Sequence, residues 1–224
     1  MAAKDTIKSL LKFVSCRATD RAFGWRHRRR WRDENGLGGL YQRYFDEYLT
    51  RAPIAEAIAE VLRNADINLP RIIEFGCSGG NNLKLLHERL STPFRYCGLD
   101  IQEAAIEFAR RQFPEDTFYK CSDTELSILK PKLGHFDIFL AASVLYYLPQ
   151  KETQAVLDFA AEIADYLVLS DYIERSDLDT GINDGLFLHP FGLMCQKAGF
   201  KIVVPAQFPW GPGNRHGLFV ARAP

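Results

Sequence analysis

The sequence predicts an α/β fold, a doubly wound and mostly parallel sheet of seven strands with an N-terminal helical extension. A short apolar run at residues 71–75 enters a glycine-rich turn, and a helical pattern follows it. Strand-like runs at 94–100 and 117–121 come next, with a helical pattern between them, as parallel βαβ units require. With 224 residues and 47% hydrophobic content, the chain is long enough to bury one large core.

The second half of the chain continues this alternation. Residues 136–144 are typical of a fourth strand, 152–164 of a crossover helix and 166–171 of a fifth strand. A further helix is expected at 191–198, where Gly199 suits the position after a helix end. The last two strands are expected at 201–207 and 217–221.

The glycine-rich turn is the strongest sign of a ligand site. Gly76, Gly79 and Gly80 permit backbone angles and a close ligand approach that a Cβ atom would block. Glu74, an acid at the end of the first strand, would repel a pyrophosphate and attract an ammonium group or a ribose hydroxyl. This acid argues against NAD or FAD, although a plain tight turn between strand and helix remains an alternative.

Two further acids follow the next two strands. Asp100 comes twenty positions after Gly80, where a carboxylate can accept hydrogen bonds from both hydroxyls of a ribose. Asp123, after Ser122, can accept from an exocyclic amine such as adenine N6. Each acid alone is also compatible with a helix N-cap, but together with Glu74 they favour a nucleoside-bearing ligand.

Four segments taken together resemble the class I S-adenosylmethionine-dependent methyltransferases. They are EFGCSGGNN from Glu74, YCGLD ending at Asp100, CSDTEL from Cys121 and FDIFLAASVLYYLP from Phe136. The resemblance covers about residues 70–224. It implies a Rossmann-like fold with an antiparallel final hairpin, and S-adenosylmethionine as the cofactor. One departure is Ser78 at the family's middle glycine, so Gly79 is expected to take up the turn geometry.

By this resemblance, Glu74 would lie near the methionine amino group, Asp100 on the ribose and Asp123 on the adenine. Tyr44 and its neighbour Tyr41, in a helical segment before the first strand, are candidates for the methionine carboxylate or the acceptor; simple packing is the alternative. The full set of expected cofactor-binding residues is Glu74, Gly76, Cys77, Gly79, Gly80, Asn81, Asp100, Ile101, Ser122, Asp123, Ala142 and Tyr44.

Methyl transfer asks little acid-base chemistry of a protein, because the sulfonium already activates the methyl group. A base is therefore expected only on the loops after the fourth and fifth strands. His189 is the first candidate, since a neutral imidazole can take a hydroxyl proton near neutral pH. A structural role before Pro190 is its alternative. The second candidate is Tyr146, followed by Tyr147, Ser143 and Asp171.

The N-terminal segment has a different character from the rest. Ten basic and two acidic residues precede position 33, so residues 1–32 carry +8 and the remainder −8 in a neutral chain. We divide the chain into a basic arm and helical lid at 1–65 and a cofactor-binding domain at 66–224. The arm is compatible with a helix packed on the domain or with an anionic membrane surface bound through 1–32. Nucleic acid is disfavoured, because no recognition motif accompanies the arginines.

Cysteine and histidine spacing excludes other classes. The five cysteines are widely spaced and form no CxxC pair, which favours a reducing compartment over a disulfide framework. The five histidines lack metal-ligand spacing, so no metal is expected. No apolar run reaches the roughly 18 residues of a membrane span, and no signal peptide pattern is present. We expect a cytoplasmic protein, peripheral at the inner membrane surface if the arm binds lipid.

The sequence thus predicts a methyltransferase that acts on an oxygen or nitrogen of a small-molecule or glycolipid (saccharide) acceptor. A non-catalytic S-adenosylmethionine-binding regulatory or assembly protein is one alternative, and an NAD or nucleotide-sugar enzyme is another. Nothing in the loops identifies the acceptor or an oligomeric state.

Overall fold

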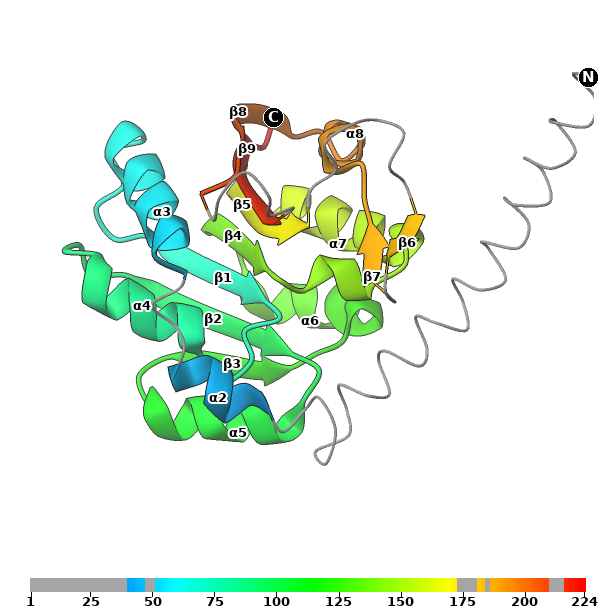
Figure 1. Ribbon diagram of the computed structural model, residues 1–224. Coiled ribbons are helices and arrows are strands. Elements are labelled where there is room, and N and C mark those ends of the chain that lie inside the picture. The colour runs from blue at the N-terminus through cyan, green and yellow to red at the C-terminus, as the bar shows by residue number, and fades with distance from the viewer. Residues whose placement is uncertain (1–39, 47–50, 173–180, 184–185, 210–215) are drawn as a thin grey trace, which may run out of the picture.

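A seven-stranded sheet with helices on both faces forms the body of the protein, seen in the computed structural model (Figure 1). The strand order is β3-β2-β1-β4-β5-β9-β8. The first five of these strands run parallel, and β9 joins β5 and β8 in antiparallel fashion. The structure describes residues 40–46, 51–172, 181–183, 186–209 and 216–224.

The strands of the main sheet are β1 (Arg71–Phe75), β2 (Arg95–Asp100), β3 (Thr117–Lys120), β4 (Phe136–Ala142), β5 (Ala164–Tyr172), β8 (Lys201–Gln207) and β9 (His216–Arg222). A separate hairpin pairs β6 (Gly181–Asn183) with β7 (Leu186–Leu188). The helices are α2 (Tyr41–Asp46), α3 (Ala52–Asn64), α4 (Asn81–Arg89), α5 (Glu103–Gln112), α6 (Leu126–Leu133), α7 (Gln150–Ile163) and α8 (Phe191–Lys197), with short 3-10 turns η3 (Asp123–Glu125) and η4 (Leu145–Tyr147).

Two hydrophobic cores lie on opposite faces of the sheet. Because successive side chains of a strand point to opposite faces, Ile72 joins the core under α3, α4 and α5, whereas Ile73 joins the core under α6, α7 and α8. The central strands are apolar on both faces, as a doubly covered parallel sheet requires. This alternation also decides which side chains at the strand ends can reach a ligand.

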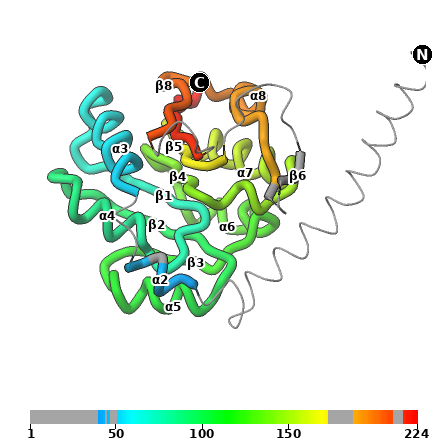
Figure 2. Tube along the Cα trace, in the orientation of Figure 1, coloured from blue at the N-terminus to red at the C-terminus, as the bar shows by residue number. Residues whose placement is uncertain are grey.

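The helices before β1 contact the sheet domain directly. The buried side chains of α3, among them Ile54 and Ile58, belong to the same core as α4 and α5. The ring of Phe45 in α2 lies 5.2 Å from that of Phe108 in α5, and Figure 2 shows these two segments side by side. The basic arm at 1–32 lies outside the described residues, and its role stays a prediction.

The expected fold class is confirmed, including the antiparallel final pair of strands. Gly199 follows α8 with φ +94, as its position predicted. Three of the expected boundaries were wrong by two residues. β4 ends at Ala142 because Ser143 turns out of the strand, α7 begins at Gln150 rather than at 152, and β5 begins at Ala164 rather than at 166.

Candidate active site

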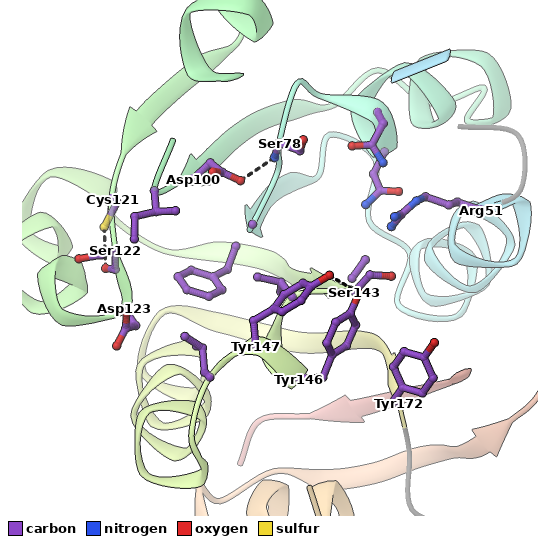
Figure 3. A pocket seen from close by; sticks show the side chains of 18 of the residues that line it. Arg51, Ser78, Asp100, Cys121, Ser122, Asp123, Ser143, Tyr146, Tyr147 and Tyr172 are labelled. Carbon is purple, nitrogen blue, oxygen red and sulfur yellow. Dashed lines mark hydrogen bonds between the residues drawn. The ribbon is translucent and has the colours of Figure 1, made fainter. Parts of the chain in front are cut away.

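A cavity of about 300 Å³ opens at the carboxyl ends of the parallel strands (Figure 3). Ligands of open α/β sheets bind at this edge, where strand order reverses between β1 and β4. The lining residues are Arg51, Phe75, Gly76, Ser78, Asn81, Asn82, Asp100, Ile101, Cys121, Ser122, Asp123, Ala142, Ser143, Val144, Tyr146, Tyr147, Leu148, Tyr172 and His216.

Backbone hydrogen bonds to the neighbouring strand β2 hold the turn after β1. The amides of Gly76 and Cys77 both donate to the carbonyl of Leu99, at 2.7 and 3.0 Å. Gly76 has φ +78, and a Cβ there would lie 2.4 Å from Cγ2 of Val144. Glycine is therefore required at this position by both conformation and space.

Ser78, rather than Gly79, has positive φ between Gly76 and Gly80, which also have positive φ. Ser78 has φ +51, and Gly79 is not among the residues with positive φ, so the expected role of Gly79 is corrected. The amide of Ser78 donates to Oδ2 of Asp100 at 2.8 Å, and this charged bond holds the serine in a conformation that usually favours glycine. Gly79 and Gly80 do not line the cavity; they make room for the rings of Phe108 and Phe113.

Glu74 lies beneath the turn instead of facing the cavity. It is fully buried on the α3 and α4 face, where its carboxylate accepts hydrogen bonds from Asn82 Nδ2 at 2.6 Å and from the Tyr96 hydroxyl. Burial raises the pKa of Glu74 to about 7. Glu74 is therefore not placed to contact a methionine amino group directly, whereas Asn82, which it binds, lines the cavity.

Asp100 reaches the cavity from the end of β2. Besides Ser78, its carboxylate accepts a hydrogen bond from the amide of Gln102 through Oδ1 at 2.9 Å; Gln102 itself is the N-cap of α5, so Asp100 is not the cap that the alternative reading expected. Burial raises the pKa of Asp100, and these backbone bonds oppose that rise. A carboxylate oxygen accepts more than one hydrogen bond, so each retains capacity for a ligand hydroxyl.

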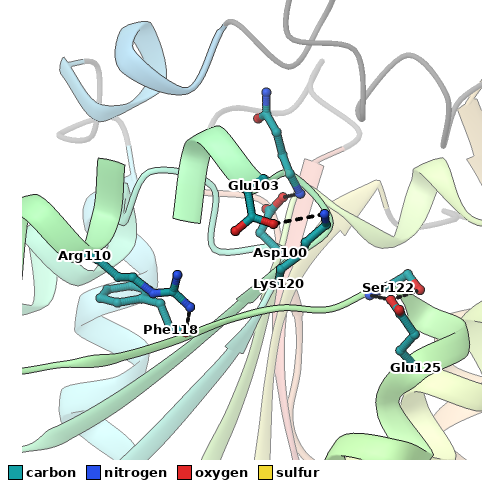
Figure 4. Close-up of polar contacts among 8 residues, drawn as sticks. Asp100, Glu103, Arg110, Phe118, Lys120, Ser122 and Glu125 are labelled. Atoms are coloured by element: carbon teal, nitrogen blue, oxygen red, sulfur yellow. Dashed lines mark hydrogen bonds and ion pairs between the residues drawn. The ribbon is translucent and has the colours of Figure 1, made fainter. Parts of the chain in front are cut away.

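The end of β3 is shaped by a capping box. Glu125 Oε2 accepts from the amide of Ser122 at 2.9 Å and from its hydroxyl at 2.6 Å (Figure 4). Asp123 is therefore not the cap of this turn, and it lines the cavity beside Ser122. An ion pair between Lys120 and Glu103, at 3.0 Å, links β3 to α5 nearby.

The opposite end of the cavity is built on the turn after β4. Ser143 has φ +56, and its amide donates to the carbonyl of Ser170 at 2.7 Å. Asp171, fully buried, accepts from the amides of Leu145 at 2.9 Å and Tyr172 at 2.7 Å. Burial raises the pKa of Asp171 to about 7. Asp171 thus shapes this turn from behind and does not line the cavity.

Aromatic rings form the wall at this end. The centroids of Tyr146 and Tyr147 lie 4.2 Å apart, and the Tyr146 hydroxyl donates to that of Tyr147 at 3.1 Å. Tyr172 meets Tyr146 edge to face at 5.1 Å, and His216 meets Tyr172 at 5.5 Å. Burial raises the pKa of Tyr146, so its hydroxyl is a hydrogen-bonding group at neutral pH rather than a base.

His216 is the histidine of the cavity. Its Nε2 lies 2.9 Å from the Ser170 hydroxyl and 3.5 Å from that of Ser143. Burial, together with the positive charge of Arg51, lowers the pKa of His216 to about 4, so the ring is neutral near pH 7. β9 brings it here by pairing His216 with Tyr172.

The structure does not bring His189 to the cavity. The side chain is 1% exposed, and its Nε2 lies 3.0 Å from the Leu148 carbonyl and 3.1 Å from the Thr153 hydroxyl. Burial lowers the pKa of His189 to about 4. These contacts fasten the segment before α8 to the turn after β4, in line with the structural alternative. Of the two catalytic candidates, Tyr146 lines the cavity and His189 does not.

Seven of the expected cofactor-binding residues meet in the cavity. They are Gly76, Asn81, Asp100, Ile101, Ser122, Asp123 and Ala142. Glu74, Cys77, Gly79 and Gly80 support the turn without lining the cavity, and the Tyr44 side chain lies outside the described part of the chain. Binding by the seven stays a prediction.

Sequence reasoning missed Arg51, Tyr172 and His216, which enter from three distant segments. Arg51 immediately precedes α3, and Pro53 in the first turn of that helix is the sequence feature that marks where the helix begins. Across the ranges that the structure covers, no cluster of potential metal ligands is found. Within the same ranges, no helix is both long and apolar enough to cross a membrane.

The order of strands, the glycine turn and the acids at the ends of β2 and β3 are typical of a Rossmann-like domain that binds a nucleoside at the carboxyl ends of its strands. A family model described as a methyltransferase domain matches residues 73–165. This match, together with the shared fold, supports the class I S-adenosylmethionine-dependent methyltransferase family that the sequence motifs predicted.

Individual relatives are more distant. The chain is 30% identical over 129 residues to the trans-aconitate 2-methyltransferase of Variovorax paradoxus (strain S110). The aligned region covers 54% of this chain and 44% of that protein. The chain therefore spans less than half the length of this curated relative.

Solved structures share the fold. A magnesium protoporphyrin IX methyltransferase from Synechocystis PCC 6803, with S-adenosylmethionine bound, has a TM-score of 0.59 at 17% identity and covers 95% of this chain and 97% of its own. A sugar N-methyltransferase from Streptoalloteichus sp ATCC 53650 has a TM-score of 0.57 at 14% identity and covers 75% and 86%.

Proposed function

We propose that this chain transfers a methyl group from S-adenosylmethionine to an oxygen or nitrogen of a small-molecule or saccharide acceptor. The observation that carries the proposal is the polarity of the cavity. Acids line one end, at Asp100 and Asp123, and Arg51 with hydroxyl groups lines the other (Figure 3). Relatives that act on trans-aconitate and on sugars support an acceptor of small size.

S-adenosylmethionine fits this polarity. Its ribose hydroxyls and adenine amine are hydrogen-bond donors, and Asp100 and Asp123 are acceptors at successive strand ends. Its methionine carboxylate is an anion, and Arg51 supplies a cation at the far side of the turn after β1. Asn81 and Asn82 lie between these groups and offer amides to the methionine part.

The bound cofactor supplies an activated methyl group on a sulfonium. Asp100 and Asp123 would hold the nucleoside part at the ends of β2 and β3, which leaves the turn after β4 for the acceptor. The rings of Tyr146, Tyr147 and Tyr172 exclude water from that end and orient the acceptor. His216, neutral near pH 7, can accept or share the proton of an acceptor group.

A dinucleotide is disfavoured by the hydrogen bonds of the first turn. A pyrophosphate needs free amides there, but those of Gly76 and Cys77 bind Leu99, that of Ser78 binds Asp100, and that of Gly80 binds the carbonyl of Cys77. This argues against the NAD alternative. A non-catalytic S-adenosylmethionine-binding protein remains distinguishable only by measuring transfer.

The test is calorimetric titration with S-adenosylmethionine, S-adenosylhomocysteine and NAD, followed by incubation with an acceptor panel. The panel comprises carboxylic acids, phenols, sugars and amines, and mass spectrometry detects the gain of one methyl group. We expect binding of the first two ligands, no binding of NAD, and methylation of at least one acceptor. Binding without transfer to any member would favour the regulatory alternative.

A further inference from the structure

The acceptor end of the cavity differs in charge from the nucleoside end. Both carboxylates among the described lining residues, Asp100 and Asp123, belong to the ends of β2 and β3. At the other end, the described lining groups with polar atoms are Arg51, Ser143, the three tyrosines and His216. Figure 3 shows the two acids on one side and Arg51 with Tyr172 on the other.

The nearest acid behind this end is turned away from the cavity. Asp171 is fully buried, and its Oδ2 accepts from the amides of Leu145 at 2.9 Å and Val144 at 3.3 Å, while Oδ1 accepts from Tyr172. Its carboxylate is therefore committed to the backbone of the turn. An ammonium ion at this end of the cavity would find no carboxylate among the described lining residues there, and a buried unpaired charge is costly.

Arg51 makes this end electrostatically positive. Burial and, to a smaller extent, the positive charge of Arg51 lower the pKa of the His216 imidazole to about 4. Among the described groups around His216 are Arg51, Ser143, Ser170 on β5 and the ring of Tyr172. With Arg51 assigned to the methionine carboxylate, a neutral imidazole and hydroxyl groups remain at this end, and these groups suit hydrogen bonds with an acceptor oxygen.

Ser143 provides a second, independent observation. Three described non-glycine residues have positive φ, and two of them, Ser78 and Ser143, line the cavity. Glycine adopts this conformation without strain, so a serine there is retained at a cost to stability. The Ser143 hydroxyl lies 3.5 Å from His216 Nε2, beside the tyrosine wall. Strain of this kind at a cavity indicates a functional use of the side chain.

We propose that the methyl acceptor is an oxygen atom, the hydroxyl or carboxylate of a flat, aromatic-like molecule, held between the tyrosine wall and the Ser143–His216 pair. This inference rests on the proposed methyl transfer and narrows it from oxygen or nitrogen to oxygen. Flat molecules are specified because Tyr146, Tyr147 and Tyr172 offer ring faces and edges rather than a branched polar surface.

Methyl transfer to a carboxylate and to a hydroxyl involves the same bond changes and differs only in the proton that is lost. The acceptor oxygen forms a bond to the methyl carbon while the carbon–sulfur bond breaks and its electron pair stays on sulfur. A carboxylate enters without a proton and leaves as a methyl ester. A hydroxyl loses its proton to His216, which returns it to solvent, and leaves as a methyl ether.

The experiment uses the full chain loaded with S-adenosylhomocysteine and three matched probes: phenol, benzoate and benzylamine. Calorimetry or ligand-observed NMR at pH 7 measures the binding of each probe. We expect phenol or benzoate to bind at least about tenfold more tightly than benzylamine, which is an ammonium at this pH. Tighter binding of benzoate would identify a carboxylate acceptor, and tighter binding of phenol a hydroxyl.

Two variants test the residues named. Ser143→Gly and His216→Asn are each expected to weaken the oxygen probe about tenfold and to leave the affinity for S-adenosylmethionine unchanged. Ser143→Gly should also raise the free energy of unfolding, because glycine adopts positive φ without strain. Weaker probe binding in a more stable variant would separate a binding role of the hydroxyl from a structural one. His135→Asn, at an exposed histidine paired with Asp165, is the control and should change neither.

Several results would overturn the oxygen assignment. They are benzylamine binding as tightly as the oxygen probes, its methylation by the S-adenosylmethionine-loaded enzyme, binding of no probe at millimolar concentration, and oxygen-probe affinity that both variants leave intact. Failure of the proposed function looks different, because S-adenosylmethionine would then either not bind or bind without transfer of its methyl group to any acceptor, whichever probe binds more tightly.

Discussion

The two ends of the cavity are assembled in different ways. The nucleoside end takes Gly76, Asp100 and Asp123 from consecutive βα units, which parallel topology brings to one edge of the sheet. The acceptor end takes Arg51 from before β1 and His216 from the last strand. Spacing along the chain therefore marks the first end, whereas the second exists only once β9 has paired with β5.

A similar contrast separates two acids that both end strands. Asp100, the last residue of β2, lies at the sheet edge and faces the cavity. Glu74 lies one residue before the end of β1, on the face covered by α3 and α4, and is fully buried there. The first acid is placed to bind a ligand and the second to hold Asn82, so position relative to the strand end matters more than residue type.

The largest expected effect concerns the turn that both ends share. Gly76→Ala adds a Cβ 2.4 Å from Val144 at a position with φ +78. Strain and overpacking together should lower the free energy of unfolding by about 2–5 kcal/mol, measured by urea denaturation. Gly192→Ala in α8 is the control, because the added Cβ would contact only the side chain of Ile202, at 3.9 Å. Equal effects of the two variants would contradict the role given to Gly76.

The buried acid should make stability depend on pH. The pKa of Glu74 rises from 4.5 to about 7 on folding, so the folded protein holds this proton more tightly than the unfolded chain. Its contribution to stability is greatest below about pH 4.5 and declines as the pH rises to about 7.

Glu74→Gln should therefore gain stability relative to wild type between pH 4.5 and 7, by at most roughly 3 kcal/mol. A glutamine can keep both contacts, because the Asn82 amide can rotate to present its Oδ1. The measurement is the denaturation midpoint across this pH range. A difference between the two proteins that is the same at all pH values would show that Glu74 is not the titrating group.

The acid that lines the cavity should affect binding instead. Asp100→Ala removes the proposed acceptor of two ribose hydroxyls, each bond to a charged acceptor contributing about 1.5–3 kcal/mol. We expect S-adenosylmethionine to bind at least about tenfold more weakly by calorimetry. Asp158→Ala, on the exposed surface of α7, serves as the control. Unchanged affinity in a folded Asp100 variant would remove the nucleoside end from the proposed site.

A smaller effect is expected at the middle of the first turn. Ser78→Gly relieves the left-handed conformation and keeps the amide that binds Asp100, so it should stabilise the fold by about 0.5–1 kcal/mol. Asp66→Gly, with φ +54 in a turn away from the cavity, should give a similar gain. A loss of stability in the Ser78 variant alone would mean that its hydroxyl supports the turn.

Deletion of residues 1–32 is expected to leave the affinity for S-adenosylmethionine unchanged, the smallest of these effects. The deletion should instead abolish binding to anionic liposomes at low salt, because each basic residue at the headgroups contributes about 1 kcal/mol and salt screens this attraction. Co-sedimentation of intact and truncated protein at two salt concentrations is the measurement. Equal sedimentation, or unfolding on truncation, would favour a helix packed on the domain.

The pattern of strands and helices was readable from the sequence because hydrophobic periodicity reflects burial directly. Runs such as 71–75 and 136–142 are apolar on both faces, which marks central parallel strands without further information. The glycine turn and the acids after β2 and β3 were readable for a related reason, since each is fixed by its own βα unit.

The side-chain roles required the tertiary structure. The sequence pointed to His189 as the base, since it follows the fifth strand, but pairing of β9 with β5 places His216 beside Ser143, while His189 contacts Leu148 under the turn. Likewise, Ser78 instead of Gly79 took the left-handed step because a bond from its amide to Asp100 outweighed its intrinsic preference. Sequence by itself determined the fold and the nucleoside end, where each residue's place follows from its own strand. Only tertiary structure decided the acceptor end, because its contacts join segments whose separation along the chain carries no periodic signal.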